Sequence, residues 1–189
     1  GSSIVLDPLD IVRISRGTGA AFETWLAGKI ELNVVDGIIL PNLKMAGEEE
    51  GCGVLTREGR CSIHPFRPGI CRLFPLGRYY EENGFRYFLQ VHECQKENRT
   101  KVKVKKWLDT PDLKKYEAYI TGWHGFLIQL QEYIAAHPES AKAVSMDVLQ
   151  RFYLTPYQTE EFYSEFFRRM DEAKKYIIAA RQGTEVPHL

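Results

Sequence analysis

Short alternating segments fill the first half of the chain, and the second half carries helical repeats. Residues 31–45 alternate in Val, Ile and Leu around Asp36-Gly37, a dipeptide that suits a tight hairpin because both central residues need positive φ. Residues 76–80 and 85–91 have the same character and are separated by a short polar segment. The pattern therefore predicts two antiparallel hairpins.

Helices are predicted on both sides of these strands. Asp7 is a typical helix N-cap and Pro8 suits the first helical position, so a helix begins there and ends near Gly17. A second short helix is expected over residues 20–26. From Val104 onward the period becomes helical, and the expected helices cover residues 113–136, 140–152 and 159–181.

Apolar side chains recur every three or four residues in the later helices, as they do on helices that pack into a core. The stripes comprise Leu127, Leu130 and Ile134, then Phe162, Phe166, Met170, Ala173 and Ile177. We predict an α+β protein in which residues 1–108 form a small cysteine-rich region of short antiparallel strands and short helices. Residues 109–189 form an α-helical extension that packs on it.

Composition places the chain among globular proteins, with 44% hydrophobic and 26% charged residues. The 25 basic and 25 acidic residues cancel, so nucleic acid and membrane surfaces are not expected partners. No apolar run would span a bilayer and no signal sequence opens the chain, which favours a cytoplasmic location. The start, Gly1-Ser2-Ser3, has no methionine, and we expect that an upstream segment or a tag preceded it.

The four cysteines all fall between positions 52 and 94 of this 189-residue chain. Four are too few for a secreted disulfide scaffold, and clustered thiols in a reducing compartment indicate metal or redox chemistry. Zinc takes thiolates and imidazoles, and iron–sulfur clusters take mainly thiolates. The alternative is that the cysteines are small core residues. The candidate metal ligands are Cys52, Cys61, Cys71 and Cys94, with His64 and His92 as weaker candidates.

A hairpin turning at residues 57–59 would place Cys52 across from Ile63-His64 and Cys61 close to the turn. The two cysteines would then be too far apart for a disulfide, which needs Cα atoms within about 7 Å, so a metal or a third residue would have to join them.

Cys71 is the best single candidate for a ligand or a reactive thiol. Pro68 is placed to start a short helix and Pro75 to stop it, with Cys71 near its first turn. The helix dipole and the neighbouring Arg67 and Arg72 are expected to favour the thiolate. The two arginines are also candidates for hydrogen bonds to carbonyl or carboxylate oxygens that hold the ligands in position.

The segment from Cys61 to Pro75, CSIHPFRPGICRLFP, preceded by residues 7–14 and by Cys52, resembles the YkgJ-type cysteine-cluster family, which is described as a zinc- or iron-chelating domain. The resemblance covers residues 4–108 and implies that the four cysteines chelate a metal. Members begin with a C-x2-C-x2-C-C signature that this chain lacks. Either this sequence starts just past that signature, or the protein is a divergent member that has lost half of its site. We expect the truncation, because the start without methionine falls where the signature would have ended, and hence a partial site.

Two functions remain open. The first is a non-catalytic protein that binds zinc, or alternatively iron or an iron–sulfur cluster, and whose helical part packs on the core or contacts a protein partner. The second is a metal- or Fe–S-dependent enzyme, such as a protein lysine N-methylase, or a thiol redox protein. The glycine pairs around Thr18 and Cys52 do not form a nucleotide loop, so no methyl-donor site is recognisable. The sequence favours the first function.

Overall fold

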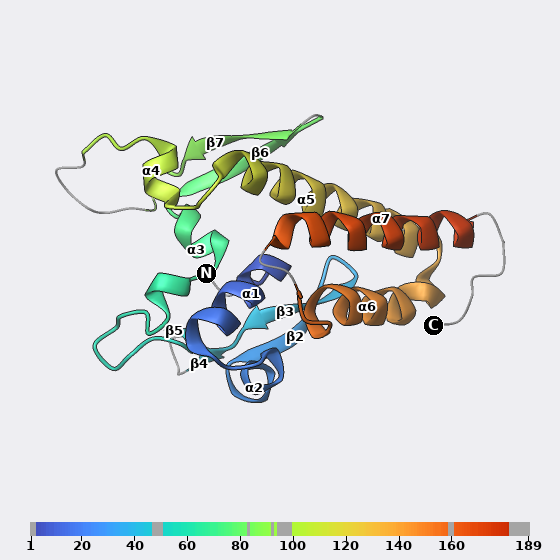
Figure 1. Cartoon of the computed structure of the whole chain (residues 1–189), viewed down its shortest axis with the longest axis horizontal. Helices are drawn as coiled ribbons and strands as arrows, with labels where there is room; N and C mark the ends of the chain where they lie inside the picture. The colour runs from blue at the N-terminus through green and yellow to red at the C-terminus, as the bar shows by residue number, and fades with distance from the viewer. Residues whose placement is uncertain are drawn as a thin grey trace.

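The computed structural model describes residues 3–46, 51–82, 84–91, 93, 100–158 and 161–181, with the backbone alone for residues 176–181. Within these ranges, none of the helices combines the length and the apolar character needed to cross a bilayer. The predicted α+β class is confirmed: short antiparallel strands and short helices precede a helical C-terminal part (Figure 1).

The N-terminal region is a three-stranded antiparallel sheet with two helices. The strands are β1 (Ile4–Val5), β2 (Ile30–Val35) and β3 (Ile38–Leu43), in the order β1-β3-β2. Asp36 and Gly37 connect β2 to β3 with φ angles of 48° and 86°, so the predicted hairpin is confirmed. The helices are α1 (Pro8–Thr18) and α2 (Phe22–Gly28).

The N-terminus of α1 is a reciprocal capping box. The Asp10 N–H donates to the Asp7 carboxylate at 2.9 Å, and the Asp7 N–H donates to the Asp10 carboxylate at 3.1 Å. The helix ends at Thr18, one residue beyond the predicted end, and Gly19 caps it with a φ of 71°. The predicted start at Asp7-Pro8 is confirmed.

The middle of the chain consists of short elements. They are β4 (Met45–Ala46), β5 (Gly51–Cys52), the 3₁₀ turn η1 (His64–Phe66), α3 (Gly69–Leu73), β6 (Leu76–Glu81), β7 (Gly84–Leu89) and α4 (Val104–Leu108). Strands β6 and β7 form the second predicted hairpin.

The C-terminal part contains α5 (Leu113–Ala136), η2 (Pro138–Ser140), α6 (Ala141–Leu149), the π-helical turn η3 (Gln150–Leu154) and α7 (Phe162–Arg181). Helices α5 and α7 lie side by side (Figure 1). Helix α6 lies along β3, where the Ile39 N–H donates to the Ser145 hydroxyl at 3.1 Å.

One hydrophobic core joins the two halves of the chain. It combines Leu6 and Leu40 from the N-terminal region with Trp123, Phe152 and Phe166 from the helices. Two buried tyrosine hydroxyls reinforce the junction: that of Tyr119 accepts from the Leu9 N–H at 3.1 Å, and that of Tyr153 donates to the Leu6 carbonyl at 2.9 Å. The stripe on α7 is buried from Phe162 to Ala173, as predicted, while the side chain of Ile177 lies outside the description.

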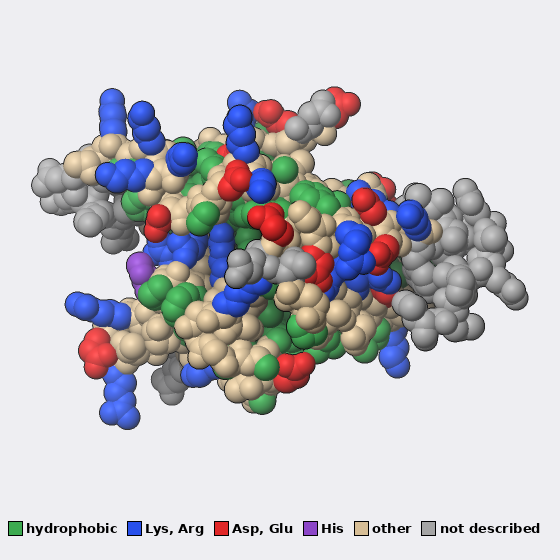
Figure 2. Space-filling view, in the orientation of Figure 1, with side chains coloured by type: hydrophobic (Ala, Val, Ile, Leu, Met, Phe, Trp, Pro, Cys, Tyr) green, Lys and Arg blue, Asp and Glu red, His purple; other side chains and the backbone are tan. Residues whose placement is uncertain are grey.

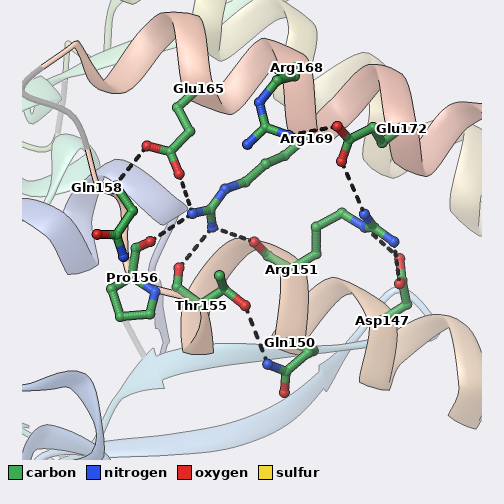
Figure 3. Close-up of a pocket in the computed structure, with 10 residues that line it drawn as sticks. All are labelled: Asp147, Gln150, Arg151, Thr155, Pro156, Gln158, Glu165, Arg168, Arg169 and Glu172. Carbon is green, nitrogen blue, oxygen red and sulfur yellow. Dashed lines mark hydrogen bonds and ion pairs between the residues drawn. The ribbon is translucent and has the colours of Figure 1, made fainter. Parts of the chain in front are cut away.

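Arg169 of α7 holds the end of η3 in place (Figure 3). Its guanidinium is buried and donates to the carbonyls of Arg151, Thr155 and Pro156 at 2.6, 2.7 and 2.8 Å, and also to the Glu165 carboxylate. The last carbonyls of a helical turn have no intrahelical donor, so a buried helix end needs such a partner. Charged side chains that line the pocket beside Arg169, among them Asp147, Arg151 and Glu172, also pair with one another.

Candidate metal-binding site

Three of the four candidate cysteines lie in described segments, and each comes from a different element. Cys52 ends β5, Cys61 follows a tight turn and forms an isolated bridge with Leu55, and Cys71 lies in α3. All three are free thiols and partly buried. Of the other three candidates, Cys94 and His92 lie outside the described residues.

The turn between the first two cysteines is where the sequence predicts it. The Thr56 N–H donates to the Arg60 carbonyl at 2.8 Å, and Gly59 adopts a φ of 71°, so Cys61 lies beside the turn. The predicted position of Cys52 across from Ile63-His64 requires a correction, because its strand partner is Met45 of β4. Residues 64–66 form η1 and therefore do not continue the hairpin.

Helix α3, which carries Cys71, is anchored by a buried carboxylate of α1. The Gly69 N–H donates to Asp10 Oδ1 at 2.7 Å across 59 residues of sequence. A Cβ atom at position 69 would lie 2.6 Å from the Tyr116 hydroxyl oxygen, so only glycine permits this close approach. The predicted short helix between Pro68 and Pro75 is confirmed.

Arg72 connects the segments on either side of Cys71. Its guanidinium donates to the carbonyls of Pro65, Arg67 and Asp109, the last two at 3.2 and 3.3 Å. The predicted bonding of Arg72 to carbonyl oxygens is confirmed. This side chain therefore fixes the loop before α3 and the end of α4 relative to Cys71.

The expectation that Cys71 is readily ionised is wrong. Burial raises the pKa of its thiol to about 12, and the negative charges of Asp10, Cys52 and Cys61 add to the effect in that order. Arg67 lowers the pKa by less. Helix α3 has only five residues, and its dipole does not offset the loss of solvation.

His64 is exposed and its ring is already engaged. The Nε2 atom lies 2.7 Å from Arg67 Nη1. A guanidinium only donates, so Nε2 supplies the lone pair in this contact. A metal would therefore compete with Arg67 for that nitrogen.

Within the described part of the chain, no three Cys, His, Asp or Glu side chains are already grouped as metal ligands. The chemistry of the donors nevertheless fits zinc or iron, since thiolates are preferred ligands of both. Sequence reasoning missed Asp10 and Tyr116 as supports for α3. The only local signal for Asp10 was its spacing from Asp7, which is typical of a capping box and gives no hint of a contact with Gly69.

Comparisons of the chain with known proteins do not assign it to a family. No protein-family model, curated protein or solved structure matches the chain. The resemblance to the YkgJ-type family thus rests on Cys52 and the segment from Cys61 to Pro75, and it stays a prediction.

Proposed function

We propose that this protein is a non-catalytic metal-binding protein in which Cys52, Cys61, Cys71 and Cys94 bind zinc, as the resemblance to the YkgJ-type cysteine-cluster family implies. One observation carries the proposal. Three cysteines from separate segments lie near enough that Cys52 and Cys61 both raise the pKa of the Cys71 thiol. Iron, alone or in an iron–sulfur cluster, is the alternative metal because it takes the same thiolate ligands.

The role of each residue follows from its contacts. The four cysteines supply sulfur, and a bound zinc would contribute charge that stabilises their thiolates. Asp10 and Arg72 keep α3 in position through Gly69 and through the carbonyl groups around Cys71. Because Cys71 is protonated at neutral pH, metal uptake must release its proton, and the affinity should rise with pH.

A thiol redox role through Cys71 is not favoured. The thiolate is the reactive form, and a pKa of about 12 leaves little of it at neutral pH. A cytoplasmic location is part of this proposal, because thiolate ligands of a metal are kept reduced there. No contact among the described residues favours a methylase over a metal-binding protein.

The test is the metal content of protein purified without oxygen. We expect close to one zinc per chain by elemental analysis and no colour, whereas absorbance near ~400 nm would identify an iron–sulfur cluster instead. Cys52→Ser, Cys61→Ser, Cys71→Ser and Cys94→Ser should each lose metal. Ile70→Ser is the matched control because Ile70 is an exposed neighbour of Cys71 on the same helix. Wild-type protein without zinc or iron, or equal metal in Cys71→Ser and Ile70→Ser, would overturn the proposal.

A further inference from the structure

Several buried donors near α3 have no acceptor within the described part of the chain. They are Arg13 Nη1, Arg67 Nε and Arg78 Nε. They come from α1, the segment before α3 and β6. Buried polar atoms in native proteins are nearly always hydrogen-bonded, so a group of unpaired donors indicates an acceptor that the protein itself does not supply.

These three arginines, which we call the arginine cluster, come from segments that approach Tyr116 of α5. Arg78 Nη2 donates to the Tyr116 hydroxyl at 2.9 Å, and the guanidinium carbon of Arg13 lies 5.5 Å from the centroid of the Tyr116 ring. Tyr87 is the direct cross-strand partner of Arg78, so both side chains project from the same face of the hairpin, and the Tyr87 hydroxyl interacts with Arg78 and with the Glu117 carboxylate. Arg67 lies two residues before Gly69, where an added Cβ atom would lie 2.6 Å from the Tyr116 hydroxyl oxygen.

The nearby carboxylates do not satisfy the arginine cluster. Asp7 accepts from the Asp10 N–H, and Asp10 accepts from the N–H groups of Asp7 and Gly69. The ion pairs of the described segments include none between Arg13, Arg67 or Arg78 and a carboxylate. Burial raises the pKa of Asp7 despite the opposing charges of Arg13 and Arg78, so Asp7 does not neutralise them. The charges are also crowded, since burial and then the charges of Arg13 and Arg67 lower the pKa of Arg72. Figure 2 shows Lys and Arg side chains gathered at this end of the molecule.

We propose that the arginine cluster binds the oxyanion group of a small molecule, either a carboxylate or a phosphate. Both groups carry several acceptor oxygens and a negative charge, which is what unpaired guanidinium N–H groups recognise, commonly with two parallel hydrogen bonds. The ligand would lie beside α3 and next to the cysteines. The inference is independent of the proposed metal, because none of the three arginines is a metal ligand in that proposal.

The experiment is calorimetric titration of the chelator-treated full chain with inorganic phosphate and, separately, with acetate, in chloride buffer of matched ionic strength. The titrant that gives saturable binding identifies the group. Arg13→Gln and Arg78→Gln should each weaken binding about tenfold or more, since a hydrogen bond to a charged group contributes about 1.5–3 kcal/mol. Arg57→Gln, in the exposed hairpin turn, is the matched control and should bind as the wild type does.

A second measurement on the wild-type chain tests the inference even if the variants do not fold. The melting temperature of the wild-type chain should rise with the bound anion above its value in chloride, by an amount that saturates with concentration. Arg78→Lys keeps the positive charge but loses the paired N–H groups of the guanidinium, so it should bind the anion more weakly than wild type. The inference is overturned if neither anion shows saturable binding. It is also overturned if wild type, Arg13→Gln and Arg78→Gln bind equally, which would mean an adventitious ion only. Anion binding by protein that takes up no metal would refute the proposed function and leave the inference standing.

Discussion

The contact between Asp10 and Gly69 makes a prediction about stability and pH. Burial, together with the charge of Asp7, raises the pKa of the Asp10 carboxyl to about 8, although backbone N–H groups of Gly69 and Asp7 oppose the shift. Replacing Asp10 with asparagine keeps an oxygen acceptor for the Gly69 N–H and removes the titrating proton. Asp10→Asn therefore separates the anchoring role of this side chain from its charge.

The sign follows from the direction of the shift. At pH values between the ordinary carboxyl pKa of about 4 and the pKa in the folded state, the folded protein holds a proton that the unfolded chain has released. The free energy of unfolding must then decrease as pH rises through this window. One such group changes stability by about 1.4 kcal/mol per pH unit, so the loss between pH 5 and pH 7 is ~2–3 kcal/mol. Asp7, whose pKa burial also raises, acts in the same direction.

The measurement is urea denaturation at half-unit steps from pH 5 to pH 8, with metal chelated throughout. Wild-type protein should lose stability across this range, and Asp10→Asn should show a much flatter profile and exceed wild type at pH 8. Asp171→Asn, at an exposed position on α7, is the control and should retain the wild-type slope. Parallel profiles for wild type and Asp10→Asn would refute the assigned pKa and its cause.

Three further predictions follow from other contacts. Arg169→Met leaves buried carbonyls and the Glu165 carboxylate without a donor. It should lower the free energy of unfolding, measured by urea denaturation, by about 3–5 kcal/mol. The double variant Arg169→Met with Glu165→Met should lose less, because no unpaired carboxylate stays buried. Equal loss in the single and double variants would contradict this. Gly69→Ala forces a carbon against the Tyr116 hydroxyl and should lower the melting temperature, whereas Gly28→Ala, with open space around it, should lower it less. Arg72→Gln should weaken zinc binding in a competition with a chromogenic chelator, and unchanged affinity would show that Cys71 needs no such support.

Local chemistry made much of the fold predictable. Asp7 and Pro8 mark the start of α1 because a cap and a first-turn proline act within a few residues. Asp36 and Gly37 set the register of the first hairpin through their own backbone preferences. The α5 helix runs from Leu113 to Ala136, as its periodicity predicts. In each case the deciding interactions lie close together in sequence.

The site was less predictable because its deciding contacts are distant in sequence. The pKa of Cys71 is set by burial and by Asp10, which is 61 positions earlier in the chain, so inspection of Arg67 and Arg72 alone gave the wrong direction. The pairing of Cys52 with Met45 depends on a short strand that the sequence does not mark. The π-helical turn at residues 150–154 depends on Arg169, a buried charge that composition cannot distinguish from a solvated one.

The two tyrosine hydroxyls that join the halves of the chain limit how the cysteine region can be used elsewhere. The Tyr119 hydroxyl accepts from the Leu9 N–H, and the Tyr153 hydroxyl donates to the Leu6 carbonyl. The helices also cover the apolar face of the sheet. A fragment that stops at residue 108 would expose that face to water and lose both bonds. The cysteine region therefore cannot be moved alone into another protein scaffold. The helices that cover the sheet would have to be transferred with it.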